Sequence, residues 1–493
     1  MSKAKCIMVQ GTMSGAGKSL LCAALCRIFA QDGYRVAPFK SQNMALNSFV
    51  TRDGLEMGRA QVVQAQAAGI EPDVRMNPIL LKPSSDVGSQ VIVHGEVRGQ
   101  MKAADYFRHK KELIPDILSA YHSLAQEVDV IVIEGAGSPA EINLKADDIV
   151  NMGLAKLVDA PVLLAGDIDR GGVFAQLYGT VELLEPEERA RIRGLIINKF
   201  RGDVEILRPG LAMLEEKTHL PVLGVVPYLK VDIEDEDSLS ERLDAKNSVK
   251  PLDVAIIRLP KLSNFTDFIP LEQHPLLGVR YVDSARTLGA PDCILLPGTK
   301  NTVDDLLWLR QCGLEAAILK QAAAGTPVLG VCGGYQMLGR TLDDSAATES
   351  GRSQTLRGLG LLPTSTVFSA EKRRTQVCAA AAGPFAGAAL TGYEIHTGRT
   401  VVEGAPFARL ADGTPEGCVC GNVFGTYLHG LFDTGELTEK LTAFLCRRKG
   451  IRPEAAALVP MAAYREQQYN KLADGVRAAL DMAAIYKAMG MER

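Results

Sequence analysis

Gly11-Thr12-Met13-Ser14-Gly15-Ala16-Gly17-Lys18-Ser19 stands between the apolar run Ile7-Met8-Val9 and a helical pattern over Lys18–Gln31. In such a strand–loop–helix unit, glycines let backbone N–H groups converge on phosphate oxygens, a lysine adds positive charge, and a serine hydroxyl joins Mg²⁺. Five residues separate the first glycine from the Gly-Lys-Ser group, where the common phosphate loop has four. The stretch predicts an ATP-binding loop in which the phosphates are surrounded by Gly15, Gly17, Lys18 and Ser19.

Strand-like runs and helical stretches continue to alternate over residues 1–228, which we interpret as an ATP-binding synthetase domain. Such alternation favours a parallel sheet with right-handed crossovers. Val130–Ile133 is apolar at every position, as a central strand buried on both faces requires. The candidate strands are Cys6–Gln10, Val36–Pro38, Val128–Ile133, Pro161–Ala165, Leu195–Asn198 and Val222–Val226.

Oxygen ligands for Mg²⁺ are expected where these strands end, because ligands of open parallel sheets collect at the carboxyl ends of the strands. Glu134 directly follows the run Val130–Ile133 and is the candidate second metal ligand beside Ser19. Asp53 is a weaker candidate for a third ligand.

Three further strand ends carry polar side chains. Lys40 ends the second strand and is a candidate contact to phosphate or to the acyl group. Asn198 ends the fifth strand, where its amide could read the amino group and ring nitrogens of adenine. The loop Asp167–Gly172 offers carboxylates and an arginine, which could clamp substrate or metal or form a structural Asp/Arg pair.

A second signature lies far downstream, where Gly330-Val331-Cys332-Gly333-Gly334 follows the apolar run Pro327–Leu329. A Gly-x-Cys-x-Gly turn between a strand and a helix holds a thiol on a strained, exposed elbow, and the helix N-terminus favours its thiolate. Cys332 is the predicted nucleophile. The N–H group of Gly333 and the region of Gly298 are the predicted donors to an oxyanion.

A thiol nucleophile needs a base, and two of the chain's histidines have a suitable setting. His429 follows a candidate strand near the end of the second domain, in Phe424–Gly430. His396, in Gly392–Arg399, is its competitor. We predict that His429 is the base and that His396 has a substrate-binding or structural role.

Composition and charge exclude several classes of protein. A net charge of -4 leaves no basic footprint, so nucleic acid is not expected as a partner. No apolar run approaches the ~18 residues of a membrane helix, and the phosphate-loop strand begins too early for a cleavable signal peptide. The ten cysteines are scattered without a C-x-x-C pair, as in a reducing compartment. We therefore expect a cytoplasmic protein without a membrane segment.

The composition changes after residue 228. Residues 229–250 contain the acidic run Asp232–Asp237 and are interpreted as a linker rather than a metal site. A second α/β pattern follows over 251–440 and is the predicted glutamine amidotransferase domain. Within it, the Ala/Gly-rich stretch Cys378–Leu390 is expected to be irregular. Residues 441–493 are predicted to form a helical C-terminal segment.

Together, these motifs resemble the cobyric acid synthase family, the glutamine-hydrolysing amidases of adenosylcobalamin biosynthesis. The resemblance runs in family order from the phosphate loop to about residue 432 and covers nearly the whole chain. Besides the phosphate loop, the segments that carry it are Pro38–Asn47, Glu134–Glu141, Leu296–Thr302, Gly330–Gln336, Gly392–Gly398 and Tyr427–Gly430.

The resemblance implies an α/β protein with two domains. The first would be a P-loop, dethiobiotin-synthetase-like parallel-sheet domain, and the second a class I glutamine-amidotransferase-like domain. It also implies ATP and Mg²⁺, glutamine as the nitrogen donor, and adenosylcobyrinic acid a,c-diamide as the substrate, with four peripheral carboxylates converted to amides. The sequence does not specify the oligomeric state.

One departure from ordinary class I amidotransferases concerns the group that orients the catalytic base. In those enzymes the histidine is followed two positions later by a glutamate, whereas Leu431 occupies that position here. The subfamily that the chain resembles shares this gap. The orienter of His429 is therefore unassigned, and the sequence predicts a dyad-like Cys–His site.

Two other functions stay open at the level of sequence. Cobyrinic acid a,c-diamide synthase has the same architecture and amidates two other carboxylates, although Ser41–Asn47 resembles the branch that forms four amides. The ATP domain could also be a partner-controlled switch, like the chromosome- and septum-positioning ATPases. Those switches lack a fused thiol elbow, so glutaminase activity distinguishes the two classes.

Overall fold

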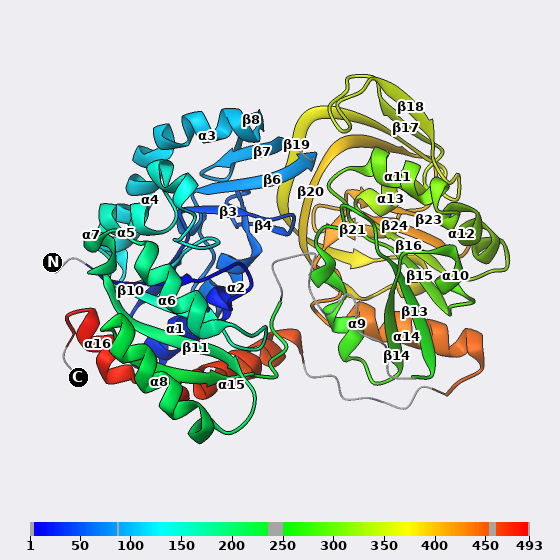
Figure 1. Ribbon diagram of the computed structural model, residues 1–493. Coiled ribbons are helices and arrows are strands. Elements are labelled where there is room, and N and C mark those ends of the chain that lie inside the picture. Colours follow the sequence, from blue (N-terminus) through cyan, green and yellow to red (C-terminus); the bar gives the residue numbers. More distant parts are fainter. Residues whose placement is uncertain (1–3, 86–87, 235–249, 453–459, 492–493) are drawn as a thin grey trace. The chain divides into compact units, whose positions relative to one another are not determined.

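The structure is a computed structural model that describes residues 4–85, 88–234, 250–452 and 460–491 (Figure 1). The chain forms two compact units, each built from separate stretches of sequence. Unit 1 takes Met1–Ala45, Glu56–Glu234 and Arg465–Arg493, and unit 2 takes Leu46–Leu55 and Asp235–Tyr464, insofar as these stretches are described. Of the predicted linker 229–250, residues 235–249 lie outside the described residues.

Unit 1 contains a six-stranded parallel sheet with the order β12-β11-β10-β1-β9-β2. The predicted parallel α/β fold of this region is confirmed, and each predicted strand corresponds to one strand of the sheet. The strands are β1 (Lys5–Gly11), β2 (Val36–Phe39), β9 (Val130–Glu134), β10 (Val162–Asp167), β11 (Ile192–Phe200) and β12 (Val222–Pro227).

Helices cover this sheet because its central strands are apolar throughout. All five residues of β9 are buried. Helix α1 (Lys18–Gln31) connects β1 to β2, and α6 (Val173–Leu183) lies between β10 and β11. The chain moves in opposite directions along the sheet at these two crossovers, so right-handed connections place the two helices on opposite faces (Figure 1).

A second, four-stranded sheet in unit 1 was not predicted from the sequence. Its order is β3-β6-β7-β8, formed by β3 (Gln42–Met44), β6 (Ile79–Ser85), β7 (Gly88–Val93) and β8 (Glu96–Lys102). Helix α2 (Arg59–Ala67) lies between β3 and β6 in the chain and packs against α1. These elements surround the segment that begins with Lys40.

The predicted helical C-terminal segment 441–493 is divided between the units. Helix α14 (Glu436–Lys449) belongs to unit 2, whereas most of α15 (Met461–Ala479) and all of α16 (Met482–Ala488) belong to unit 1. An apolar face of α15 and α16 packs into the same core as α1. Its buried residues are Tyr469, Leu472, Ala473, Val476, Leu480, Ile485 and Tyr486.

Unit 2 is built on a six-stranded sheet with the order β14-β13-β15-β16-β24-β23, parallel except for β23. The predicted second α/β domain is thereby confirmed. Its strands are β13 (Leu252–Ile257), β14 (Leu277–Val282), β15 (Cys293–Leu296), β16 (Val328–Val331), β23 (Cys418–Cys420) and β24 (Val423–Thr426).

A second sheet of unit 2 is dominated by the long hairpin of β19 (Thr364–Ala381) and β20 (Ala389–Val402) (Figure 1). The expectation of an irregular stretch over Cys378–Leu390 was therefore wrong at its two ends, where residues 378–381 and 389–390 are strand, and it holds only for the connection 382–388. Alanines 379 and 380 pair with residues 390 and 389, and only the turn contains the short helix η6 (Gly383–Phe385). Backbone pairing along a neighbouring strand here overrides the weak strand propensity of alanine.

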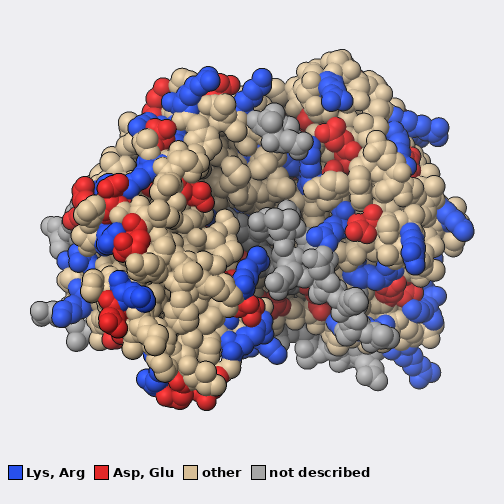
Figure 2. All heavy atoms as spheres, viewed as in Figure 1, with Lys and Arg blue, Asp and Glu red and all other residues tan. Residues whose placement is uncertain are grey.

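The surface carries both signs of charge. On the face of each unit that Figure 2 shows, Lys and Arg side chains are interspersed with Asp and Glu side chains. Among the described residues, none of the helices combines the length and apolar character that crossing a membrane requires.

Candidate active sites

Cys332 lies at the strand–helix elbow of unit 2, between β16 and α13 (Gly333–Leu338). Its backbone is in the left-handed region with φ 52°, which is strained for a residue with a side chain. The Cys332 N–H group donates to the carbonyl of Thr426 at 2.8 Å and holds the elbow against β24. A Cβ atom at Gly334 would lie 2.1 Å from the carbonyl oxygen of Leu296, so only glycine fits there.

His429 lies on β25 (Leu428–His429), which pairs with β20 so that Tyr393 lies opposite His429. Its Nδ1 atom is 2.6 Å from Oδ2 of Asp267, and both side chains are buried. The other carboxylate oxygen of Asp267 accepts the N–H group of Gly430 at 2.9 Å. Because Asp267 engages Nδ1, the Nε2 atom is the ring nitrogen available to Cys332, whose side chain contributes to the raised pKa of His429.

This arrangement favours the protonated form of His429. Burial lowers the pKa of His429, but the charge and hydrogen bond of Asp267, together with the hydrogen bond to Cys332, raise it to about 10. An imidazolium beside a thiol stabilises the thiolate, which is the nucleophilic form. The described residues thus contain a Cys332–His429–Asp267 triad rather than a dyad-like pair.

Asp267 is the orienter that sequence reasoning did not find. It lies in η5 (Phe265–Phe268), 162 residues before the histidine, where no motif spacing relates the two. The sequence did contain one signal for it. Phe265 and Phe268 flank Asp267 and indicate that the aspartate is buried, and a buried carboxylate needs a partner.

Both predicted oxyanion residues border the catalytic side chains. A Cβ atom at Gly298 would lie 3.1 Å from Cε1 of His429, so the lack of a side chain lets the ring approach this loop. A Cβ atom at Gly333 would lie 2.7 Å from Cγ2 of Thr299, in the same loop. The loop after β15 and the start of α13 therefore face each other beside the elbow, as two N–H donors to one oxyanion require.

His396 is held in a neutral state beside the elbow. Its ring stacks on Tyr427, with centroids 3.7 Å apart, and its Nδ1 atom is 3.2 Å from the carbonyl oxygen of Gly398. Burial and the charge of Arg373 lower the pKa of His396 to about 4. The preceding residue, Ile395, places its carbonyl oxygen 3.6 Å from the sulfur of Cys332. These contacts suit a structural or glutamine-binding role better than that of a base.

The phosphate loop of unit 1 has the backbone that a phosphate cradle needs. Gly15 and Gly17 have φ angles of 76° and 90°, which are favourable only for glycine. Lys18 is buried, and its ammonium group donates to the carbonyl oxygens of Met13 at 2.9 Å and Gly137 at 3.0 Å. The lysine therefore bridges the loop to the segment that follows β9.

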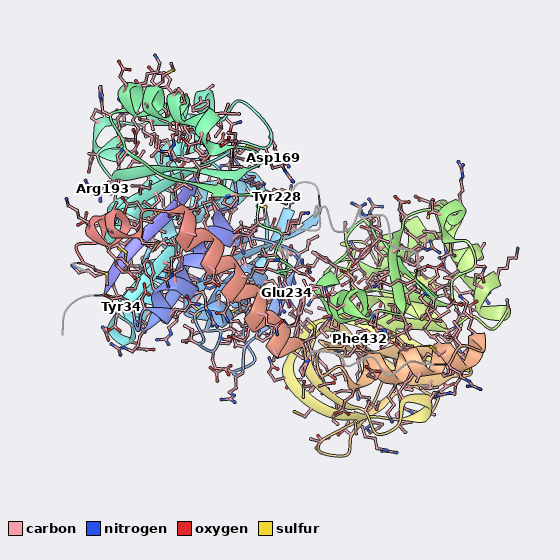
Figure 3. All side chains as sticks on the ribbon, turned by 90° about the horizontal axis from the view of Figure 1, so that it is seen from below. Tyr34, Asp169, Arg193, Tyr228, Glu234 and Phe432 are labelled. Carbon is pink, nitrogen blue, oxygen red and sulfur yellow. The ribbon has the colours of Figure 1, made fainter. Side chains whose placement is uncertain are left out.

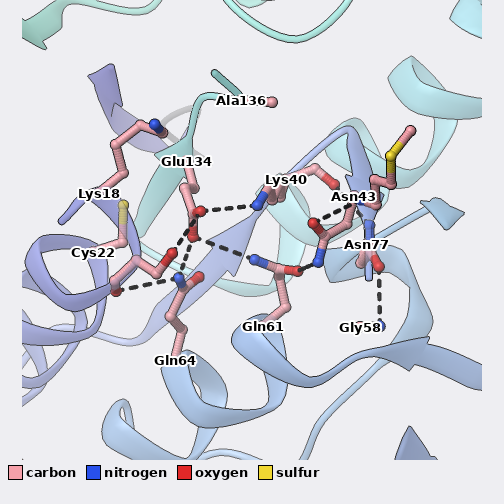
Figure 4. Close-up of polar contacts among 12 residues, drawn as sticks. Lys18, Cys22, Lys40, Asn43, Gly58, Gln61, Gln64, Asn77, Glu134 and Ala136 are labelled. Atoms are coloured by element: carbon pink, nitrogen blue, oxygen red, sulfur yellow. Dashed lines mark hydrogen bonds and ion pairs between the residues drawn. The ribbon is translucent and has the colours of Figure 1, made fainter. Parts of the chain in front are cut away.

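Ser19, Glu134 and Lys40 meet at the carboxyl end of β9. Figure 4 shows Lys40 beside Glu134. The Ser19 hydroxyl and the Lys40 ammonium group each donate to Oε1 of Glu134 at 2.9 Å. Burial raises the pKa of Glu134, but the charge and hydrogen bond of Lys40 hold it below its ordinary value. Ser19 and Glu134, the metal ligands predicted from the sequence, are thus adjacent. Lys40 directly follows β2 and places a positive charge beside Glu134 at the end of β9.

Two buried glutamines of α2 complete this cluster and were missed in the sequence. Gln64 donates to Oε2 of Glu134 at 2.5 Å, and Gln61 lies 3.4 Å from the same oxygen (Figure 4). The two glutamines lie one helical turn apart, and both are buried. The signal for them was the apolar pair Val62-Val63 between the two glutamines, because burying an amide is costly unless it has polar partners.

Asn198 approaches the phosphate loop from β11. Its side-chain nitrogen donates to the carbonyl of Ala16 at 2.9 Å, and a Cβ atom at Gly17 would collide with it at 2.1 Å. The next residue, Lys199, has φ 61° and donates to the carbonyl of Gly15 at 2.7 Å and to Asp167 at 2.8 Å. Both side chains therefore brace the loop at the expected nucleotide end of the sheet.

The loop Asp167–Gly172 carries ion pairs at the same end of the sheet. Asp169 accepts a hydrogen bond from Arg201 at 2.8 Å, and the Arg201 guanidinium lies 3.6 Å from the ring centroid of Tyr228. In Figure 3, Asp169 and Tyr228 lie together, away from Arg193 at the amino end of β11. Within the loop itself, Arg170 lies 3.9 Å from Oδ2 of Asp167, which is the Asp/Arg pair of the structural alternative, whereas Asp169 pairs with Arg201 outside the loop.

Asp53, the weaker candidate for a metal ligand, lies in an exposed turn of the segment Leu46–Leu55. That segment belongs to unit 2, whereas Ser19 and Glu134 belong to unit 1. Its role beside them stays a prediction. Among the described residues, no group of three or more His, Cys, Asp or Glu side chains could hold a metal ion.

Family models match both units. Residues 7–239 match the CobQ/CobB/MinD/ParA nucleotide binding domain, and residues 253–437 match the CobB/CobQ-like glutamine amidotransferase domain. The two matches together cover most of the chain, and they fall on the phosphate loop and on the thiol elbow, respectively.

The chain is similar over nearly its full length to curated bacterial proteins named cobyric acid synthase. The protein of Lachnoclostridium phytofermentans is 56% identical over 511 residues, covering 99% of both chains. That of Ruminiclostridium cellulolyticum is 57% identical and covers 99% of this chain and 97% of its own. The Streptococcus sanguinis protein is 52% identical, again with 99% of each chain covered.

Proposed function

The chain belongs to the cobyric acid synthase family, and from this premise we propose how it acts and on what. It is a glutamine-hydrolysing carbon–nitrogen ligase that forms cobyric acid. Its substrate is adenosylcobyrinic acid a,c-diamide, and the four carboxylates b, d, e and g become amides. Each amidation consumes one ATP and one glutamine.

One observation carries this proposal. A single chain holds a buried Cys332–His429–Asp267 triad and a phosphate loop with Ser19 and Glu134 2.9 Å apart. A thiol triad releases ammonia from an amide, and a phosphate loop activates an acceptor. The two kinds of chemistry depend on each other only when nitrogen released at one site is transferred to a carboxylate activated at the other.

The triad supports hydrolysis of glutamine through a thioester. The Cys332 thiolate attacks the side-chain amide carbon, and N–H groups beside Gly333 and Gly298 stabilise the oxyanion. His429 gives its proton to the amide nitrogen, and ammonia leaves. His429 then takes a proton from water, which attacks the thioester and releases glutamate and the thiolate. Asp267 holds the imidazole in the orientation that both proton transfers require.

The phosphate loop supports activation of the corrin carboxylate as an acyl phosphate. A carboxylate oxygen attacks the γ-phosphorus of ATP, and ADP leaves. Lys18 and Lys40 offset negative charge on the oxygens during this transfer. Ammonia then attacks the acyl carbon, inorganic phosphate leaves, and the amide remains.

Mg²⁺ fits the oxygen donors at this site. It prefers a few protein oxygens together with water and substrate phosphates, and Ser19 and Glu134 present a hydroxyl and a carboxylate side by side. When bound, it would neutralise phosphate charge. Lys40, whose ammonium group donates to the Glu134 carboxylate at 2.9 Å, is the candidate contact to the phosphates or the acyl group.

Two substitutions test the division of labour between the sites. Cys332→Ala is expected to abolish amidation from glutamine while leaving amidation from ammonium salt largely intact, because the thiol only releases ammonia.

Lys18→Ala is expected to reduce amidation from either nitrogen source by roughly a hundredfold or more, since phosphate contacts in the transition state contribute several kcal/mol. Amide formation on the a,c-diamide corrinoid is followed by mass spectrometry.

The same assay separates the related functions. Cobyrinic acid, offered in place of its a,c-diamide, is the substrate expected of a diamide synthase, and its preferential use would overturn the proposed substrate. Loss of ammonia-dependent amidation in folded Cys332→Ala protein would contradict the proposed separation of the two sites.

A further inference from the structure

The segment Leu46–Leu55 connects two parts of unit 1 in sequence but belongs to unit 2. Both of its flanks are fixed in unit 1. The Ala45 N–H group donates to the carbonyl of Leu81 at 3.1 Å, and Glu56 forms a buried ion pair with Lys82 at 2.9 Å. Within unit 2, strand β4 (Ser48–Val50) packs alongside β19 and β20 (Figure 1).

Asn47 and Ser48 make buried hydrogen bonds in unit 2. The side-chain oxygen of Asn47 accepts the backbone N–H group of Asn264 at 2.7 Å. The carbonyl oxygen of Ser48 accepts from the side-chain nitrogen of Asn264 and from the hydroxyl of Tyr393, both at 3.1 Å. Asn264 also donates to the Tyr393 hydroxyl at 2.7 Å. None of these four residues exposes more than 4% of its surface.

Asn264 begins the short helix that carries Asp267. Its φ of 54° is the left-handed conformation, which asparagine tolerates at a cost when hydrogen bonds hold it. The Asp267 N–H group donates to the carbonyl of Asn264 at 3.1 Å. The contacts of Asn47 with this residue therefore fix the turn from which the Asp267 carboxylate reaches His429.

Tyr393 extends the same contacts to the base itself. Its ring is stacked on the His429 ring, with centroids 5.5 Å apart and an angle of 25° between the planes. Phe49 packs edge-on against the same tyrosine, with centroids 5.2 Å apart. The segment thus contacts Asn264 and Tyr393, which are the direct neighbours of Asp267 and His429.

We propose that Asn47, Asn264 and Tyr393 are positioning residues of the glutaminase site, an inference that rests on the proposed function. Asn47 acts through Asn264 on Asp267, and Tyr393 acts on the His429 ring. The glutaminase triad is therefore positioned in part by a segment that lies, in sequence, between two strands of the ATP-binding unit. None of the three residues needs to contact glutamine.

The test compares Asn47→Ala, Asn47→Asp and the exposed neighbour Arg52→Ala, with glutamate release and ammonia-dependent amidation measured for each. Asn47→Ala is expected to lower the kcat of glutamine hydrolysis about tenfold or more, as loss of a buried hydrogen bond can. The KM for glutamine stays within about twofold, and amidation from ammonium salt is retained. Asn47→Asp keeps an oxygen for the Asn264 N–H group and restores most of kcat, and Arg52→Ala matches the unsubstituted protein.

Tyr393→Phe provides a second test if Asn47→Ala does not fold. It keeps the ring on His429 and removes only the hydroxyl that binds Ser48 and Asn264, so a smaller loss of kcat at unchanged KM is expected. The pH profile of glutamate release adds a readout that a purely structural role would not move, and its basic limb, where the His429 imidazolium is lost, should shift to lower pH in Asn47→Ala. A kcat within twofold of the unsubstituted protein in both variants, or an effect on KM alone, overturns the proposal. Absence of glutaminase activity in the unsubstituted protein would instead contradict the proposed function.

Discussion

Asp267 illustrates how much of this site depends on single residues whose neighbours are far away in sequence. Its two carboxylate oxygens have different partners, the His429 ring and the Gly430 N–H group. One side chain thus sets both the orientation of the base and the backbone that carries it. The same carboxylate also favours the charged form of His429, so its removal can be measured as a change in pH dependence.

We predict that Asp267→Asn lowers glutaminase kcat at least about tenfold and moves the basic limb of its pH profile downward by about one pH unit or more. Asp267 helps to raise the pKa of His429 to about 10, and its loss lets that pKa fall toward the ordinary value of about 6.5. The protonated form exists below the pKa, so the imidazolium is then lost at a lower pH. Glutamate release between pH 6 and 10 measures the limb, and an unshifted limb would count against Asp267 as the orienter.

At the scale of elements, the C-terminal helix α15 is joined to α2 through Glu234. Arg59 and Arg465 both form ion pairs with this carboxylate, whose side chain is 5% exposed. Burial raises the pKa of Glu234, but the charges of the two arginines lower it to about 2. Helix α2, which carries the two glutamines beside Glu134, is thus bound through Glu234 to the C-terminal helix α15.

Glu234→Gln is expected to destabilise unit 1 by about 3–5 kcal/mol, because it leaves two buried guanidinium groups without a counter-charge. The depressed pKa means that this stabilisation is complete above the unfolded-state value of about 4.3 and is lost as the pH falls toward about 2. The difference between variant and unsubstituted protein should therefore be full at pH 7 and shrink below pH 4.3. Urea unfolding followed by circular dichroism tests this, and a pH-independent difference would contradict it.

At the scale of the whole molecule, one chain carries two sites of different chemistry, and the proposed function connects them through ammonia. Cys332 lies in unit 2, and the cluster of Ser19, Glu134 and Lys40 lies in unit 1. The proposed acyl phosphate explains why both are needed. Ammonia cannot displace the oxygen of a free carboxylate at neutral pH, and transfer of a phosphoryl group supplies a leaving group.

We predict that one ADP and one inorganic phosphate are formed for each amide. Substrate carboxylates labelled with heavy oxygen should deliver one labelled atom to each phosphate, because the attacking carboxylate oxygen leaves with the phosphoryl group. Mass spectrometry of the released phosphate measures the transfer. Formation of AMP and pyrophosphate, or of unlabelled phosphate, would rule out this mechanism and indicate adenylation or uncoupled ATP hydrolysis.

Local pattern in the sequence determined the parallel sheet and the two signature turns. The apolar run of β9, the glycines before Lys18 and the glycines around Cys332 act through neighbouring residues, so their structural meaning is contained in a short stretch. The fold class of both domains and the family resemblance followed from such stretches and were confirmed.

Tertiary structure alone decided the partners that complete each site. Asp267 reaches His429 across 162 residues, Gln64 reaches Glu134 across 70, and Asn47 reaches Asn264 across 217. Sheet order and the course of the chain between strands set these pairs, and no periodicity in one sequence encodes them. Burial then makes them specific, because a carboxylate or amide removed from water is stable only where a partner stands within hydrogen-bonding distance.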